Sequence, residues 1–316
     1  MLDARARGNV EVIGRRRFLA AAFGSVVVGA AANPAKSILV HEHVMVDFIG
    51  ADRIVPGRYD ADEVFRAAKR KLEEVKRLGC VRLLECTPNF LGRDPALLAR
   101  LADATGVELW SNTGLYGAGD HKFVPAFARS ETAEQLARRW IAESKQAWRP
   151  RFIKTGVNKG PLDELDRKLV RAAAIASRET GLAVACHTGD GRAALDELEI
   201  FARESADLSK LVWVHAQNEK NHAVHEEVAR AGAWVEFDGI GPKSADWHLE
   251  CVRAMAGRGL LGRVLISQDS GWYRVGEPNG GEYRGYTYLY TDFLPRLDPA
   301  WVSQLMWVNP RSAFGA

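Results

Sequence analysis

The stretch Ile38-Leu39-Val40-His41-Glu42-His43 is a short apolar, β-branched run that ends in two histidines. Such a run, followed by a polar loop and a segment of helical periodicity, is typical of one β-then-α unit. A doubly wound open sheet often carries a glycine-rich phosphate turn after its first strand, and here that position reads His41-Glu42-His43. The first unit therefore favours a closed barrel over the open sheet, which is its rival.

The same unit repeats from Ile38 to the end of the chain. The further strand-like runs are Val81–Cys86, Val107–Asn112, Arg151–Thr155, Leu182–His187, Leu211–His215, Ala233–Phe237 and Val264–Ser267. Helical patterns between them include Ala61–Leu78, Ala133–Trp148, Asp163–Thr180 and Asp246–Arg258, and the helix-ending glycines are Gly79, Gly106, Gly181 and Gly232. About eight such units predict an α/β fold of the (β/α)8 TIM-barrel type, with residues 33–316 as one domain.

The charge of the chain excludes some classes of partner. All of the formal net charge of +3 comes from the first 32 residues, which hold five arginines and two acidic residues. The remaining body is neutral and therefore has no electrostatic footprint for nucleic acid or an anionic membrane. Average glycine and proline content, with 47% hydrophobic residues, argues against collagen-like and disordered chains.

Residues 1–32 are predicted to be an export signal. Arg15-Arg16-Arg17-Phe18-Leu19 resembles the twin-arginine signal, and a weakly apolar run to Ala32 follows it. We expect cleavage after Ala32, export by the twin-arginine machinery, and a periplasmic or secreted chain without stable membrane insertion. An uncleaved anchor or a wrongly chosen start codon is the alternative, and a signal that does not function would leave the protein in the cytoplasm.

The ends of the predicted strands carry metal-ligand side chains. His41 and His43 end the first strand, and the other ends carry Lys154, His187, His215 and, after the last strand, Asp269. In a barrel, functional side chains gather at the C-terminal ends of the strands. Neutral imidazoles and carboxylates are good ligands for borderline divalent ions such as zinc. The sequence thus predicts a metal site, and the alternative for any one of these histidines is a satisfied core residue.

Lys154 is the exception in this set, because a protonated ammonium is repelled by metal ions. Addition of CO2 to its amine would make a carbamate, which is an anionic bridging ligand. Two divalent ions would then be balanced by the carbamate, Asp269 and a bridging hydroxide, with a residual charge of about +1. A surface lysine is the alternative.

These strand ends resemble the phosphotriesterase-like family of the amidohydrolase superfamily. The resemblance rests on Val40-His41-Glu42-His43, Phe152-Ile153-Lys154-Thr155-Gly156, Cys186-His187-Thr188-Gly189, Val214-His215-Ala216, Ser267-Gln268-Asp269 and the closing Asn309-Pro310-Arg311-Ser312-Ala313-Phe314. It implies a binuclear site with His41, His43 and Asp269 on a buried ion. It further implies His187 and His215 on an exposed ion, and a carboxylated Lys154 that bridges both.

The predicted mechanism follows from these charges. Two metal ions make a bridging hydroxide available near neutral pH, and the exposed ion polarises the carbonyl or phosphoryl oxygen of the substrate. Asp269 takes the proton of the nucleophile and passes it to the leaving group. Cys186 neighbours a ligand on the same strand and must point to the opposite face, so it is not expected to be a nucleophile. The four cysteines are expected to be buried thiols without a disulfide framework.

The sequence departs from the family pattern at two positions. Gln268 precedes Asp269 where many relatives are expected to have histidine, but strand alternation turns it away from the site. The segment Ala216-Gln217-Asn218-Glu219 lacks the acidic proton-relay residue of organophosphate-hydrolysing members. This absence weakens the case for a true phosphotriesterase.

The substrate pocket is predicted from residues near the strand ends. Tyr116 is the predicted second catalytic residue, because lactone-hydrolysing relatives have a site tyrosine at this position. Trp272, Tyr273 and Arg274 follow Asp269 and are candidate substrate contacts, with loop packing as the alternative. The remaining histidines, His121, His222, His225 and His248, are expected on the surface.

The function predicted from the sequence is zinc-dependent hydrolysis of a cyclic or activated ester, with a lactone favoured. A phosphotriester is the first alternative and an amide or carbamate the second. A non-catalytic protein that keeps the metals as structure belongs to a different class and is the least favoured. Assembly as a homodimer stays open.

Overall fold

The computed structural model describes residues 34–315. The export signal predicted for residues 1–32 lies outside the described residues, so it stays a prediction. Within residues 34–315, none of the helices has both the length and the apolar character needed to span a membrane.

The strands of the described residues include a ring of parallel barrel strands. The strands are β1 (Ser37–Glu42), β2 (Met45–Val46), β3 (Cys80–Glu85), β4 (Glu108–Trp110), β5 (Asn112–Thr113), β6 (Phe152–Gly156), β7 (Val184–His187), β8 (Leu211–Val214), β9 (Trp234–Phe237), β10 (Val264–Ile266) and β11 (Tyr273–Arg274). They pair in the orders β1-β3-β4 and β5-β6-β7-β8-β9-β10, and β4 and β5 are two segments of one barrel strand interrupted at Ser111. The ring closes where the Asp269 N–H donates to the His41 carbonyl at 3.1 Å.

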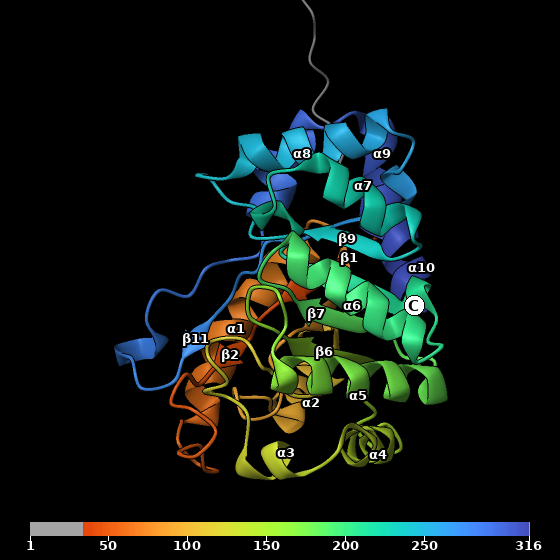
Figure 1. Ribbon diagram of the computed structural model, residues 1–316. Helices are drawn as coiled ribbons and strands as arrows, with labels where there is room; N and C mark the ends of the chain where they lie inside the picture. The colour runs from red at the N-terminus through yellow and green to blue at the C-terminus, as the bar shows by residue number, and fades with distance from the viewer. Residues whose placement is uncertain (1–33, 316) are drawn as a thin grey trace, which may run out of the picture. The chain divides into compact units, whose positions relative to one another are not determined.

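Helices surround these strands (Figure 1). They are α1 (Ala61–Lys76), α2 (Pro95–Thr105), α3 (Ala126–Ser130), α4 (Ala133–Glu143), α5 (Glu164–Thr180), α6 (Gly191–Arg203), α7 (His222–Arg230), α8 (Ala245–Gly257), α9 (Pro299–Ser303) and α10 (Asn309–Phe314). Because each barrel strand returns through helical structure to a parallel neighbour, the fold is the predicted (β/α)8 barrel.

Local signals explain where the helices begin and end. The Asp60 carboxylate accepts the N–H groups of Asp62 and Glu63 and so caps α1, and Gly181 ends α5 in the left-handed conformation with φ of 73°. The predicted helix over Ala133–Trp148 is longer than the observed helix, since α4 ends at Glu143. The Ser144 hydroxyl donates to the Ile141 carbonyl and competes with the helical backbone there.

Alternation along the strands places the site inside the barrel. Phe152 packs in the interior, at 5.8 Å between ring centroids from Phe314 of α10, and Lys154 follows two residues later on the same face. In β1 the pairing with β3 shifts register between Leu39 and Glu42. This irregularity lets His41 face the interior although Val40 also packs there.

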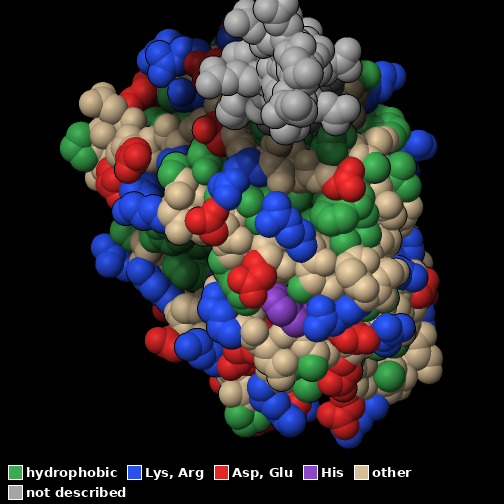
Figure 2. Space-filling view, turned by 90° about the horizontal axis from the view of Figure 1, so that it is seen from above, with side chains coloured by type: hydrophobic (Ala, Val, Ile, Leu, Met, Phe, Trp, Pro, Cys, Tyr) green, Lys and Arg blue, Asp and Glu red, His purple; other side chains and the backbone are tan. Residues whose placement is uncertain are grey.

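The short parallel pair of β2 and β11 was not predicted from the sequence. Tyr273 pairs with Met45 and Arg274 with Val46. The pair ties the loop after β1 to the loop after β10, and both loops follow metal-ligand candidates. On the face of the molecule in Figure 2, acidic and basic side chains of the described residues are interspersed.

Candidate metal centre

The six predicted ligands lie at the C-terminal ends of five barrel strands. His41 is in β1, Lys154 in β6 and His187 at the end of β7, while His43, His215 and Asp269 follow β1, β8 and β10. His41, His43 and Lys154 are buried, whereas His187, His215 and Asp269 are partly accessible. His41 and His43 are thus more deeply buried than His187 and His215, while Asp269, which was predicted to share the inner ion with His41 and His43, is partly accessible.

The inner side brings His41, His43 and Asp269 together. Asp269 Oδ1 lies 3.2 Å from His43 Nε2 and 3.8 Å from His41 Nε2. The nitrogen and oxygen atoms of this trio all lie within 4.8 Å of one another, which is close enough for one ion to contact all three. The Oδ1 atom of Asp269 is itself buried and has no hydrogen-bond partner among residues 34–315, which is consistent with a metal-ligand atom.

The outer side consists of His187 and His215, whose ring centroids are 4.3 Å apart. The His215 ring also lies 5.2 Å from the His41 ring, so the two sides are contiguous. Lys154 is 1% exposed, and its Nζ has no hydrogen-bond partner among the described residues. A buried ammonium without a partner is costly, and conversion to a metal-bridging carbamate would remove that cost. The donor set thus fits two divalent ions.

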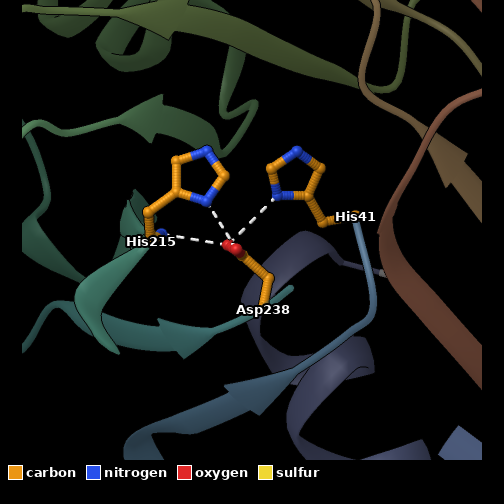
Figure 3. Close-up of side chains that lie close together, drawn as sticks. All are labelled: His41, His215 and Asp238. Atoms are coloured by element: carbon orange, nitrogen blue, oxygen red, sulfur yellow. Dashed lines mark hydrogen bonds and ion pairs between the residues drawn. The ribbon is translucent and has the colours of Figure 1, made fainter. Parts of the chain in front are cut away.

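Asp238 is a site residue that the sequence interpretation missed. Its carboxylate contacts two candidate ligands at once, with Oδ1 at 2.5 Å from His215 Nδ1 and Oδ2 at 3.3 Å from His41 Nδ1 (Figure 3). Glu236 Oε1 lies 2.9 Å from the same His41 nitrogen. Carboxylates on Nδ1 hold a ligating histidine in the tautomer whose Nε2 is free for a metal ion.

His43 is held in the same way by a neutral hydroxyl. Its Nδ1 lies 2.7 Å from Thr87 Oγ1, and that hydroxyl donates to Glu85 Oε1 at 2.5 Å. Burial raises the pKa of Glu85 to about 7. Between the two histidines, Glu42 accepts the backbone N–H groups of Gln268 and Ser270 and so fixes the segment that carries Asp269.

Burial favours the neutral, ligating form of two candidate histidines, His43 and His187. It also opposes protonation of His41, but the acidic groups around that ring raise its pKa well above the ordinary value. Burial lowers the pKa of His43 to about 4 and that of His187 well below its ordinary value, and the ammonium of Lys154 acts in the same direction on both. Both imidazoles are therefore neutral at neutral pH, which is the ligating form. Burial opposes ionisation of Asp269, but His41 and His43 outweigh it and lower the pKa of the carboxylate.

Two of the candidate ligands have strained backbones. His215 has φ of 65° and Asp269 has φ of 48°, values that side chains other than glycine rarely adopt. The His215 N–H donates to Asp238 Oδ2 at 2.9 Å, which holds the turn in place. Such strain persists only where the surroundings over-determine it, and it concentrates at functional sites.

Four aromatic side chains join the inner side of the centre to the outer side. Trp272 lies 4.5 Å from His43 between ring centroids, and Tyr116 OH lies 2.9 Å from His187 Nδ1. The ring centroid of Phe48 lies 5.5 Å from that of Trp272 and 6.0 Å from that of Phe123. The Phe123 ring in turn lies 5.9 Å from the Tyr116 ring. We call these four residues the aromatic wall. Phe48 and Phe123 were not predicted, because each looks like an ordinary loop hydrophobe in the sequence.

The structure does not bring Tyr273 and Arg274 to this wall. The Tyr273 hydroxyl donates to Glu63 Oε1 of α1 at 2.6 Å, and Arg274 lies 3.7 Å from Glu277. Cys186 donates to Glu197 behind β7, and Gln268 donates to the Tyr286 carbonyl, so both side chains face away from the centre. All four cysteines are buried and free.

The expectation that four histidines lie on the surface is wrong for two of them. His225 and His248 are 0% and 2% exposed, whereas His121 and His222 are partly buried. His225 Nε2 lies 2.7 Å from the Ala216 carbonyl and His248 Nε2 lies 2.6 Å from the Asp238 carbonyl. These hydrogen bonds to backbone carbonyls offset the cost of burying the two polar rings.

A (β/α)8 barrel with histidine and carboxylate side chains gathered at its strand ends is typical of the metal-dependent hydrolases of the TIM-barrel class. A sequence model of the phosphotriesterase family matches residues 27–311, and the chain belongs to this family.

Among its relatives, the phosphotriesterase homology protein of Escherichia coli is 27% identical over 281 residues, which cover 86% of this chain and 94% of that protein. The aryldialkylphosphatase of Saccharolobus solfataricus is 26% identical over 240 residues, covering 73% and 76%. The crystal structure of a mutant phosphotriesterase-like lactonase from Deinococcus radiodurans superposes with a TM-score of 0.79 at 26% identity, covering 90% of this chain and 97% of that one.

Proposed function

We propose that this family member is a binuclear metal hydrolase that opens a lactone or an activated ester. His41, His43 and Asp269 would hold the inner ion, His187 and His215 the outer one, and a carboxylated Lys154 both. The observation that carries the proposal is the buried Nζ of Lys154, which has no hydrogen-bond partner among residues 34–315 and whose charge acts on a histidine of each side. Zinc is the proposed metal, because imidazole and carboxylate ligands suit it.

Two divalent ions bound here would supply an activated water molecule and an electrophile for the substrate oxygen. Asp269 is an ionised carboxylate beside His43, so it can accept the proton of the attacking water and deliver it to the leaving oxygen. Asp238 and Glu236 keep the ligand histidines oriented throughout. Asp269 is thus the proposed catalytic residue, with Tyr116 beside the outer histidine.

The aromatic wall supports a carbonyl substrate with a flat or apolar body. Burial raises the pKa of Tyr116, so its hydroxyl stays protonated and can donate to a substrate oxygen. A planar carbonyl needs one polarised oxygen and a ring-sized space, whereas a phosphotriester needs room for three substituents. The aryldialkylphosphatase among the relatives makes a phosphotriester the second candidate.

We expect the best lactone to have a kcat/KM at least about a hundredfold above that of paraoxon, a difference of roughly 2.7 kcal/mol in transition-state stabilisation. Purified metal-loaded protein should be assayed against γ- and δ-lactones, aryl esters, amides and paraoxon. Tyr116→Phe should lower the lactone value more than the paraoxon value. A faster paraoxon rate, or equal losses in the variant, would move the protein to the triesterase side, and no turnover at all would favour the non-catalytic alternative.

We also propose export through the twin-arginine route, on the evidence of Arg15, Arg16 and the apolar run after them. Arg15→Lys combined with Arg16→Lys should block export and leave hydrolase activity in the cytoplasm intact, because all six ligands lie beyond residue 32. Cell fractionation measures the outcome. Normal appearance of the double variant in the periplasm contradicts the proposed route.

A further inference from the structure

A cavity of about 510 Å³ lies beside the metal centre and is separate from it. The segments 54–61 and 89–94, which precede α1 and α2, form most of its lining, together with Met45 and Asp47. None of the six ligand candidates and none of the aromatic wall lines it. Its volume is in the range of sites for small organic molecules. We propose that this cavity binds a small amphiphilic carboxylate.

The acidic groups of the cavity are already satisfied. Asp47 accepts the Ile49 N–H on Oδ1 at 3.1 Å and Arg58 Nε on Oδ2 at 2.6 Å. Asp94 accepts the N–H groups that begin α2 on Oδ1 and the Tyr59 hydroxyl on Oδ2. Both oxygens of each carboxylate already accept hydrogen bonds from the protein, so these groups do not favour a cationic ligand or one rich in donors.

The donors of the cavity, by contrast, are in excess. Arg58 donates a hydrogen bond from Nε to Asp47, but among residues 34–315 its two terminal nitrogens have no hydrogen-bond partner. The side chain is only 25% exposed. The Asn89 side chain accepts the Phe90 N–H, and its amide nitrogen is likewise without a partner in the described residues. Arg93 differs, because it pairs with Glu143 and the Asn112 carbonyl.

These donors determine the chemistry of the ligand. The terminal nitrogens of a guanidinium match the two oxygens of a carboxylate, and this bidentate pairing is strong and directional. Arg58 would then bridge Asp47 through Nε and the ligand through its terminal nitrogens. The other walls are apolar and include Met45, Ile54, Val55, Pro56 and Phe90. A carboxylic acid with a short aliphatic or aromatic body would pair with Arg58 and pack against these apolar walls.

The ligand class of the cavity matches the product class of the proposed reaction. Opening a lactone or ester releases a carboxylic acid, so the product would carry the group that this cavity recognises. That match rests on the proposed function, whereas binding of the acid does not. Met45 belongs to β2, which begins two residues after His43, so the cavity adjoins the loop that follows the inner ligands.

Octanoate is the probe, titrated calorimetrically into the metal-loaded full chain. Saturable binding is expected, and Arg58→Gln should weaken it at least about tenfold, since a charge-assisted bidentate contact is lost. Arg53→Gln is the matched control, because Arg53 is an exposed arginine of the same loop that does not line the cavity. Val55→Glu changes a residue that is 60% exposed and should also weaken octanoate through repulsion without disturbing the fold.

The same titrations contain the contradicting outcomes. Octanoate that competes with substrate and binds Arg58→Gln as tightly as the wild type sits at the metal centre, and the proposed site is then wrong. If octanol binds as tightly as octanoate, the cavity does not recognise the carboxylate group, and the proposal is wrong. Lactone turnover by Arg58→Gln should equal that of the wild type. Octanoate binding that depends on Arg58 in a chain without hydrolase activity would support the cavity and reject the proposed function alone.

Discussion

Lys154→Ala is expected to lose both bound metal ions and to lower kcat/KM at least about a thousandfold, a loss of roughly 4 kcal/mol of transition-state stabilisation. The side chain is buried, its Nζ has no hydrogen-bond partner in the described residues, and its charge acts on both His43 and His187. Without an anionic bridge, the ions would face each other with too little negative charge between them. Elemental analysis and lactone kinetics measure the two losses.

Rescue and stability separate this effect from unfolding. Acetate or propionate should partly restore metal and activity, because a carboxylate can occupy the space of the lost carbamate. Lys154→Met should leave the metal-free fold at least as stable as the wild type, since it removes an unpaired buried amine while keeping volume. Lys159→Ala, an exposed lysine after the same strand, is the control and should change nothing. Full metal content in unrescued Lys154→Ala contradicts the carbamate bridge.

Asp238→Asn is expected to weaken metal binding by about 10- to 100-fold, the usual cost of losing a partner that orients a ligand. The native carboxylate accepts from the ring nitrogens of both His41 and His215. An asparagine of the same size has one acceptor and one donor group. The amide NH2 group would face Nδ1 of one histidine and stabilise the tautomer that carries its proton on Nε2. A protonated Nε2 cannot bind a metal ion.

A chelator competition series measures the metal affinity of this variant, with the free energy of unfolding of the metal-free chain measured alongside. Asp246→Asn is a matched control, because Asp246 is an acidic residue of α8 that is 92% exposed. Equal metal affinity of Asp238→Asn and the wild type would show that Asp238 does not orient the ligands.

The fold and the inner architecture of the site could be predicted because they depend on local periodicity. A strand that alternates apolar residues and ends in His, Lys or Asp specifies both the barrel unit and the position of the ligand. The same rule applied to Trp234-Val235-Glu236-Phe237-Asp238 would have placed Glu236 and Asp238 inside the barrel with Trp234. Two acids on the inner face of a buried strand were the signal that the prediction did not use.

Other features depend on contacts between distant segments and have no local signal. Phe48 and Phe123 are 75 positions apart in the sequence, and only the folded loops bring their rings to 6.0 Å. His225 and His248 were expected on the surface because they lie in helical segments, yet Nε2 of each ring is hydrogen-bonded to a carbonyl outside its own helix. The turn of Tyr273 toward Glu63 similarly depends on the pairing of β2 with β11.

The central claim is that two divalent ions held by this ligand set perform the hydrolysis. The most direct measurement is a zinc titration of chelator-stripped protein, with hydrolysis of the best lactone followed at each addition. The account predicts no turnover without metal and a rise that stops at two ions per chain. Full turnover by the metal-free chain, or saturation at a single ion, would contradict it.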